Sequence, residues 1–203
     1  MSSKILGGFA RGLNLQTPKD DLIRPTSVMI RRKLFDWRQK LNGHAFVDLC
    51  AGSGAVGLEA FSRGADELWV SEPNRIVYKV LESNVKLFAD RYGDYFEQDI
   101  VCYQKPLDQF LKTFLSSYLE WSDEQKAQTI LFLDPPYGKI EIYEEALRQL
   151  KEAGYTGELW LESDELKGMK SQEARKHFSK ILKIVEQGDH YVLVGEISLA
   201  DKT

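Results

Sequence analysis

The four-residue segment Asp134-Pro135-Pro136-Tyr137 carries the most specific chemistry in the sequence, and it directly follows the apolar run 129–133. Consecutive prolines fix φ and remove two amide donors, so the backbone carbonyls beside Asp134 point in fixed directions. The Asp134 carboxylate and the Pro135 carbonyl could accept the two hydrogens of an exocyclic amino group on a nucleobase, while Tyr137 stacks on the base. A rigid turn would explain the prolines but not the flanking acid and aromatic residue. We therefore predict a catalytic site that holds an amino group.

A second candidate site is the glycine-rich segment 47–57, which reads Val-Asp-Leu-Cys-Ala-Gly-Ser-Gly-Ala-Val-Gly. A strand, a tight turn and a helix start let a ligand approach the backbone closely and meet helix N-terminal amides. Three of the glycines also match the dinucleotide pattern GxGxxG, and Glu72 follows at the end of the next expected strand, where an acid can bind ribose hydroxyls. Asp48 favours S-adenosylmethionine over NAD, because its carboxylate would repel a pyrophosphate and attract ammonium and sulfonium groups. The alternative is that the glycine turn only connects the strand to the helix and binds no ligand.

These two segments belong to a repeated strand-then-helix pattern that starts near residue 43. Alternating strands and helices require right-handed crossovers and a mostly parallel sheet with helices on both faces, and ligands bind at the carboxyl ends of its strands. The sequence therefore predicts an α/β, Rossmann-like fold with both candidate sites at one edge of the sheet. The expected strands are 45–49, 68–71, 95–98, 129–133, 157–161 and an antiparallel pair, 181–185 and 191–197. After residue 43, one helix is expected to begin at 55, and three more are expected to span about 76–89, 107–118 and 143–153.

Length and composition are those of one ordinary globular domain with a short extension. The chain has 203 residues, of which 43% are apolar and 29% charged, and this balance excludes disorder and low complexity. No apolar run approaches the roughly 20 residues of a membrane-spanning helix, and no signal-peptide pattern is present, so we expect a cytoplasmic protein without a membrane partner. The two cysteines, Cys50 and Cys102, have no metal-ligand spacing to histidines, so no metal site is expected.

The first 40 residues are basic although the whole chain has a net charge of −4. They contain nine Lys and Arg against three Asp and Glu, a net charge of +6, which leaves −10 for the rest. A basic arm on an acidic body predicts that the arm grips a polyanion, although a solvated helix surface would give the same pattern. We accordingly divide the chain into an N-terminal arm and helix, 1–42, and a catalytic domain, 43–203.

Within this extension the sequence predicts a short hairpin or extended arm over 4–15, with Arg11 near its turn, and then a helix from about 27 to 41. Its apolar residues share one face, which we expect to dock on the body: Ile30, Leu34, Trp37 and Leu41. The opposite side of the helix would then offer Arg31, Arg32 and Arg38 to solvent or to a partner.

The order of these segments resembles the class I S-adenosylmethionine-dependent methyltransferases that modify amino groups. It is more closely similar to the bacterial family that methylates guanine N2 in 16S ribosomal RNA. The shared segments are Gly7-Gly8-Phe9-Ala10-Arg11-Gly12, 22–26 and 34–37 ahead of the fold, and Glu162 and Gly188-Asp189 near its end. Val28 and Met29 stand where that family usually has an acid and an arginine, and Arg32 stands where it usually has an acid.

The resemblance implies a seven-stranded sheet, S-adenosylmethionine as methyl donor and a set of functional residues. The implied cofactor contacts are Asp48, Cys50, Ala51, Gly52, Gly54, Glu72, Pro73 and Asp99. The implied catalytic residues are Asp134, Pro135 and Tyr137. The implied RNA contacts are Arg11, Arg24, Thr26, Arg31 and Arg32.

From these features we expect a monomeric enzyme that transfers a methyl group from S-adenosylmethionine to N2 of a guanine in 16S ribosomal RNA, free or within the small ribosomal subunit. An adenine-N6 methyltransferase acting on DNA or RNA is an alternative, because the segment 134–137 would serve that amino group equally well. A catalytically silent RNA-binding assembly factor is an alternative from another class of protein. A dinucleotide oxidoreductase is the last, since no catalytic His, Lys or Tyr-Lys spacing supports it.

Overall fold

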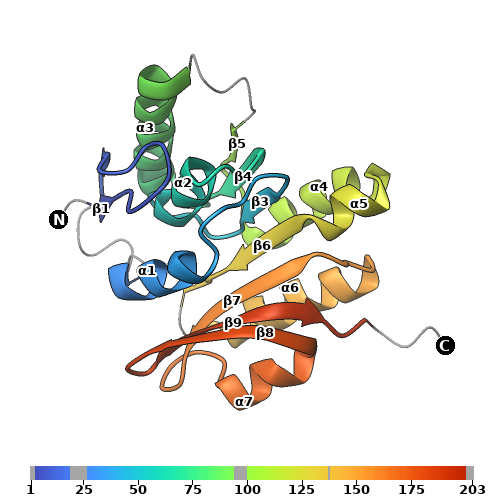
Figure 1. Ribbon diagram of the computed structural model, residues 1–203. Helices are drawn as coiled ribbons and strands as arrows, with labels where there is room; N and C mark the ends of the chain where they lie inside the picture. The colour runs from blue at the N-terminus through green and yellow to red at the C-terminus, as the bar shows by residue number, and fades with distance from the viewer. Residues whose placement is uncertain (1–2, 19–26, 94–99, 137, 200–203) are drawn as a thin grey trace.

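The computed structural model describes residues 3–18, 27–93, 100–136 and 138–199, and its centre is one seven-stranded sheet (Figure 1). The strand order is β5-β4-β3-β6-β7-β9-β8, and the first five strands are parallel, as predicted. β9 runs antiparallel to both β7 and β8, which confirms the expected closing pair. The strands are β3 (Ala45–Asp48), β4 (Glu67–Ser71), β5 (Ile100–Tyr103), β6 (Thr129–Leu133), β7 (Glu158–Asp164), β8 (Phe178–Gln187) and β9 (His190–Ile197). The range 95–98, expected for the third strand, lies outside the described residues, and the strand itself is β5.

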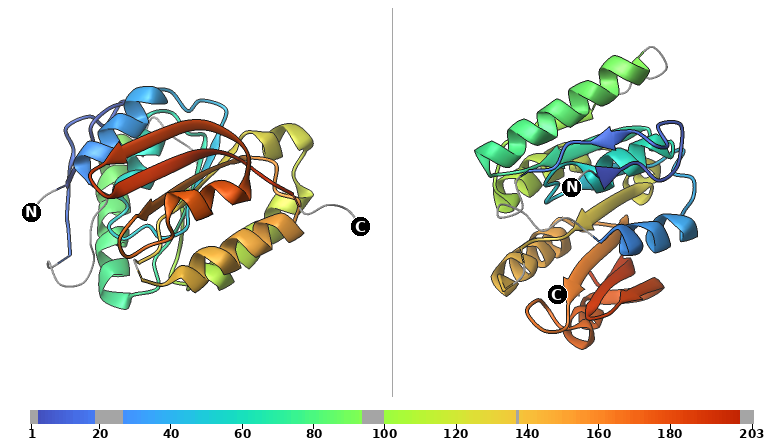
Figure 2. Two further views of the ribbon diagram at one scale, coloured as in Figure 1. Left: turned by 90° about the horizontal axis from the view of Figure 1, so that it is seen from below. Right: turned by 90° about the vertical axis from the view of Figure 1, so that its left-hand side faces the viewer.

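Helices cover both faces of the sheet, as the side views of the ribbon show (Figure 2). One apolar cluster lies under the helices on the α1 side, and a second lies under those on the α6 side. β6, at the centre, is buried along its whole length, which explains its continuous apolar sequence. The helices are α1 (Val28–Trp37), α2 (Ala55–Ser62), α3 (Arg75–Tyr92), α4 (Leu107–Glu120), α5 (Asp123–Ala127), α6 (Ile140–Glu152) and α7 (Ser171–Ala174). Among the described residues no helix is both long and apolar enough to cross a membrane.

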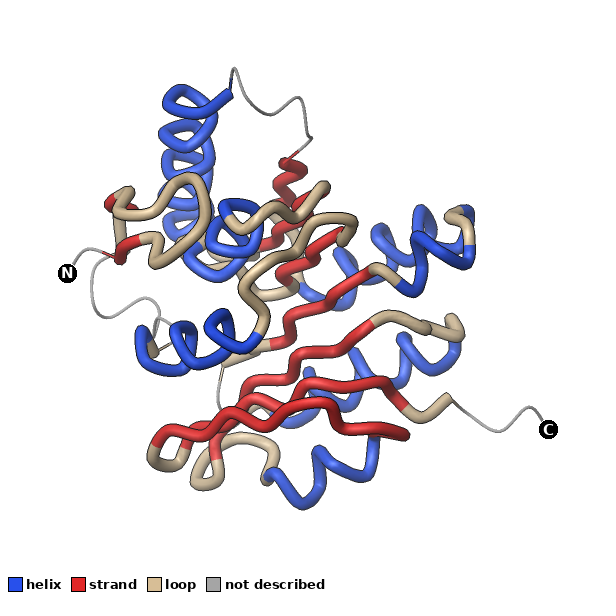
Figure 3. Tube along the Cα trace, viewed as in Figure 1, coloured by secondary structure: helices blue, strands red, loops and turns tan. Residues whose placement is uncertain are grey.

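The N-terminal segment is the predicted hairpin, with β1 (Ser3–Lys4) paired antiparallel to β2 (Asn14–Leu15). It packs against α2 and α3 as part of the main core (Figure 3), and the Phe9 ring makes edge contacts with Phe61 and Phe88. Gly8 is required at this contact, because its φ is +74° and a Cβ would overlap the Ser62 carbonyl. Buried apolar contacts therefore hold the hairpin against the body of the protein.

The exposure predicted for Arg31 is wrong, because its side chain is only 1% exposed. The guanidinium donates to Ser3 Oγ (3.1 Å), to the Lys4 carbonyl (2.7 Å) and to the Ala55 carbonyl (3.1 Å). Burial lowers the pKa of Arg31, while the negative charge of Glu59 opposes that shift. The hairpin packs against the side of α1 that carries Arg31. The alternation of apolar and polar residues along the helix assigns that side to solvent, because it does not take the hairpin into account. Conversely Trp37, expected on the docking face, is 36% exposed.

Replacing Arg31 by alanine is expected to lower the free energy of unfolding by about 3 kcal/mol, because three hydrogen-bond acceptors lose a buried charged donor and a cavity remains. Arg32→Ala, its exposed neighbour, should change stability by less than about 0.5 kcal/mol. Urea unfolding of both variants followed by tryptophan fluorescence measures the difference. Equal effects of the two substitutions would contradict the structural role of Arg31.

Candidate active site

The carboxyl ends of β3, β4, β6 and β7 border one cavity of about 950 Å³, at the upper end of the range for ligand sites. The carboxyl ends of β6 and β7, the first turn of α1 and the β8–β9 turn all lie on the left-hand side of Figure 1. The sequence-predicted residues that line the cavity are Asp48, Cys50, Ala51, Gly52, Glu72, Pro73, Asp134 and Pro135. The cavity thus brings the glycine loop and the Asp134-Pro135 segment together at one edge of the sheet. Asp99 and Tyr137 lie outside the described residues.

The glycine loop is held in a conformation that its glycines permit. Gly52 and Gly54 have φ of +54° and +83°, a left-handed region that side chains disfavour. The Ala51 amide donates to the Ser71 carbonyl (2.8 Å), and buried Asn84 donates to the Ser53 carbonyl (2.8 Å). These bonds fix the loop between β4 and α3, with its backbone lining the cavity. Gly54 itself is the N-cap of α2 and does not line the cavity.

Asp48 places a buried carboxyl group beneath this loop. Its side chain is 1% exposed and accepts hydrogen bonds from the amides of Gly57 (3.2 Å) and Cys50 (3.4 Å). Burial raises its pKa to about 7, the two amides oppose the shift, and the negative charge of Glu72 adds to it. No lysine or arginine in the described parts of the chain offsets this charge. A cationic ligand would stabilise the ionised form.

Glu72 supplies a second acid on the neighbouring strand end. It is 7% exposed and accepts from the Asn74 amide (2.8 Å), while burial raises its pKa and the amides of Asn74 and Gly52 oppose that shift. Two buried carboxyl groups suit S-adenosylmethionine, which carries cationic groups and ribose hydroxyl donors, and they disfavour a pyrophosphate. The residues present therefore fit this cofactor.

Cys50 belongs to the glycine-rich segment and lines the cavity, but it is not a nucleophile. Burial raises the pKa of its thiol well above the usual value, and the negative charges of Asp134, Asp48 and Glu72 raise it further. The thiol therefore stays protonated, and only the thiolate would be reactive.

The Asp134-Pro135 segment begins where β6 ends at Leu133. Asp134 is partly exposed and Pro135 is buried, and both line the cavity. Because Pro135 has no amide hydrogen, the sheet ladder cannot continue, and the carbonyls beside Asp134 are left for a ligand. An acid and rigid carbonyls at this place can hold a donor group such as an amine.

Two further cavity residues lie outside the two candidate segments. Glu162 on β7 and His190 on β9 both line the cavity, and the sequence used Glu162 only as part of a resemblance. Asp164, also on β7, lies 3.6 Å from His190 and accepts from the amides of Leu166 and Lys167. In the sequence, an Asp or Glu stands at or next to the end of every expected parallel strand, and this pattern could have indicated Glu162 as a site residue.

The described residues among the expected RNA contacts, Arg11, Arg31 and Arg32, do not line the cavity. Arg11 and Arg32 are exposed, Arg31 is buried as described above, and Arg24 and Thr26 lie outside the described residues. A second basic stretch, 167–183, carries six Lys and Arg against one Glu. It spans α7 and the start of β8, within a part of the chain whose net charge is negative overall. Its exposed basic residues are Lys167, Lys170, Arg175, Lys176 and Lys180.

Comparisons with known proteins identify relatives of this arrangement. The family model described as Conserved hypothetical protein 95 matches residues 3–184. Ribosomal RNA small subunit methyltransferase D of Escherichia coli is 28% identical over 170 residues, covering 82% of this chain and 77% of the relative. The putative rRNA methyltransferase YlbH of Bacillus subtilis is 26% identical over 144 residues, covering 68% and 77%.

Solved structures confirm the expected fold. The putative methyltransferase yhhF from Escherichia coli aligns with a TM-score of 0.72 at 24% identity, covering 98% of this chain and 100% of that one. Trm1 from Pyrococcus horikoshii, solved with S-adenosyl-L-methionine, aligns with a TM-score of 0.57 at 12% identity, covering 92% and 59%. The chain thus has the class I methyltransferase fold.

Lowering the pH from about 8 to about 6 is expected to weaken S-adenosylmethionine binding, because protonating Asp48 removes a charge that attracts the cationic ligand. Since burial raises the pKa of Asp48 to about 7, affinity should be flat above that pH and fall by up to about tenfold per unit below it. Isothermal titration calorimetry in two buffers of different ionisation enthalpy measures the affinity and the protons released.

The Asp48→Asn variant should bind S-adenosylmethionine more weakly, and its affinity should not depend on pH. The Asp108→Asn variant, which changes another acid in the same cavity, should keep the pH dependence of the wild type. A wild-type affinity that stays constant over this pH range would show that Asp48 does not contact the cationic part of the ligand.

Proposed function

The chain belongs to the family described as Conserved hypothetical protein 95, and we propose that it methylates N2 of a guanine in 16S ribosomal RNA. The chain is an S-adenosylmethionine-dependent ribosomal RNA methyltransferase. The guanine, the 16S RNA as target, a monomeric state and a cytoplasmic location are parts of the proposal. The observation that carries it is the single cavity shared by the glycine loop and Asp134-Pro135.

The chemistry asked of the protein is mainly alignment. S-adenosylmethionine, when bound, supplies an electrophilic methyl group. The lone pair of a guanine amino nitrogen is delocalised into the ring, so the Asp134 carboxylate and the Pro135 carbonyl hold the two amino hydrogens and direct the lone pair at that methyl carbon. The amino nitrogen must lose one proton when it takes up the methyl group, and the Asp134 carboxylate would accept that proton. Such positioning can lower the activation free energy by several kcal/mol.

The proposal is tested with small ribosomal subunits from cells that lack this protein. Labelled methyl transfer, nuclease digestion and chromatography of the nucleosides should yield N2-methylguanosine. N6-methyladenosine would show that the protein methylates adenine instead of guanine. No transfer despite cofactor binding would support the alternative of a catalytically silent RNA-binding protein.

Asp134→Ala is expected to lower kcat for methyl transfer by at least about 100-fold, because it removes the acceptor that orients the amino group. The dissociation constant of S-adenosylmethionine should change by less than about threefold, since Asp134 lies past the end of β6 rather than in the glycine loop. Asp123→Ala, an exposed acid on α5, is the matched control and should retain full activity. An Asp134→Ala variant with wild-type turnover would refute the role of this carboxylate.

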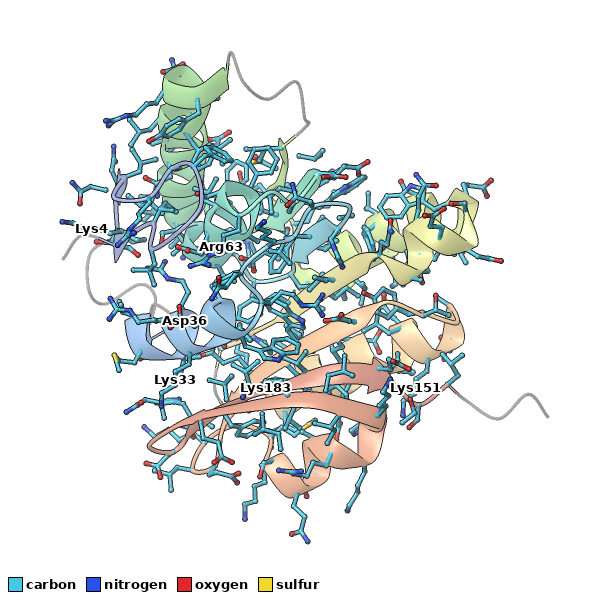
Figure 4. All side chains as sticks on the ribbon, in the orientation of Figure 1. Lys4, Lys33, Asp36, Arg63, Lys151 and Lys183 are labelled. Carbon is cyan, nitrogen blue, oxygen red and sulfur yellow. The ribbon has the colours of Figure 1, made fainter. Side chains whose placement is uncertain are left out.

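For RNA docking, two exposed basic regions offer complementary charge. Arg11 belongs to the hairpin and Arg32 to α1, whose neighbour Lys33 donates to the Glu186 carbonyl at the β8–β9 turn (2.8 Å). Lys4 and Lys33 project from the hairpin and α1 (Figure 4). The second region is the stretch 167–183. An acidic body with localised basic regions would let RNA approach only on those sides.

The double variants Arg11→Ala/Arg32→Ala and Lys170→Ala/Lys176→Ala are each expected to reduce the slope of log affinity against log salt by about 1.8, that is about 0.9 per lost phosphate contact. Filter binding of 16S ribosomal RNA at several salt concentrations measures the slope. Lys112→Ala, an exposed residue on α4, should leave it unchanged. If neither double variant alters the slope, RNA docks on another surface.

A further inference from the structure

Glu162 occupies a defined place beside the candidate catalytic acid. In the parallel register of β6 and β7, Leu133 pairs with Leu161, so the next residues along the two chains are Asp134 and Glu162. Both line the same cavity. The register therefore places two acidic residues at adjacent positions on neighbouring strand ends, and both line the cavity.

The backbone of Glu162 is fixed from two directions. It pairs with Val192 of β9, and its carbonyl accepts from the hydroxyl of buried Tyr143 on α6 (3.0 Å). Its side chain is only 2% exposed and follows the fully buried Trp160 on the same face of β7. A carboxyl group held on a central strand of the sheet is more precisely placed than one on a loop.

In the proposed reaction, Asp134 and Pro135 contact only the amino group, so the ring nitrogen N1 of the base has no assigned partner. The amino hydrogens of either guanine or adenine satisfy Asp134 and Pro135 equally. The two bases differ at the adjacent ring nitrogen: N1 of guanine carries a hydrogen and donates, whereas N1 of adenine accepts. A carboxylate next to the amino-holding group is complementary to guanine and repels the lone pair of adenine.

We propose that Glu162 is the specificity-determining residue that accepts the N1 hydrogen of the target guanine. This inference rests on the proposed function and deepens it, because it names the group that selects guanine over adenine at the same site. Discrimination arises from the penalty of leaving a buried acceptor unpaired against the wrong base.

The test uses small subunits reconstituted with 16S ribosomal RNA that carries either guanine or 2-aminopurine at the methylated position. 2-Aminopurine keeps the 2-amino group but has an accepting N1, so only the contact assigned to Glu162 distinguishes the two substrates on that side. Wild-type protein should favour guanine by at least about 30-fold in kcat/KM, the range expected for loss of a hydrogen bond to a charged group. Glu162→Gln, which can donate as well as accept, should reduce that preference at least about tenfold.

Glu158→Gln is the matched control, because it makes the same change on the same face of β7 at the far end of the strand, where Glu158 pairs with Arg38. It should keep the wild-type preference. S-adenosylmethionine affinity and the thermal unfolding midpoint of Glu162→Gln should stay close to those of the wild type, which separates specificity from folding.

The possible outcomes separate the two proposals. Wild-type protein that makes no N2-methylguanosine while binding S-adenosylmethionine overturns the proposed function itself. Wild-type protein that methylates guanine but accepts 2-aminopurine equally well overturns the role of Glu162 without any variant. An unchanged preference in a folded Glu162→Gln protein overturns it as well.

Discussion

The burial of negative charge at the carboxyl edge of the sheet is the constraint on which the site depends. Asp48, Glu72, Glu162 and Asp164 are each less than 10% exposed and end three neighbouring or nearby strands. Backbone amides satisfy part of this charge: those of Gly57 and Cys50 for Asp48, Asn74 for Glu72, and Leu166 and Lys167 for Asp164. Buried ionised groups are costly without partners. An edge of this kind is completed by ligands that bring cations and hydrogen-bond donors.

That constraint links stability to ligand binding. The folded-state pKa of Asp48, about 7, lies above its ordinary value of 3.8, so the folded chain holds this proton more tightly than the unfolded chain. For this group, stability is greatest below the unfolded pKa and falls as the pH rises toward about 7. Binding of a cation by the ionised carboxylate recovers that loss. The site thus trades stability of the ligand-free protein for attraction to its cofactor.

The sequence predicted those parts of the fold and site that depend on local chemistry. The apolar run that became β6, the turn glycines and the Asp134-Pro135 segment each follow from a few adjacent residues. Arg31 could not be placed correctly, because its burial depends on carbonyls contributed by the distant hairpin and α2. The position of Glu162 next to Asp134 depends on the register of β7 against β6, which no single segment of the sequence contains.

The N-terminal hairpin and the glycine loop are hydrogen-bonded to the same buried polar residues, which connect the basic extension to the carboxyl edge of the sheet. Arg31 joins Lys4 of the hairpin to Ala55, the first residue of α2. Asn84 exchanges hydrogen bonds with the backbone of Gln16 and also donates to the Ser53 carbonyl in the glycine loop. Within residues 3–18 and 27–93, the segment that would meet RNA and the loop that would hold the cofactor are therefore bonded through the same side chains. If RNA docks on the hairpin as proposed, these shared hydrogen bonds would connect the docking surface to the loop that lines the cofactor cavity.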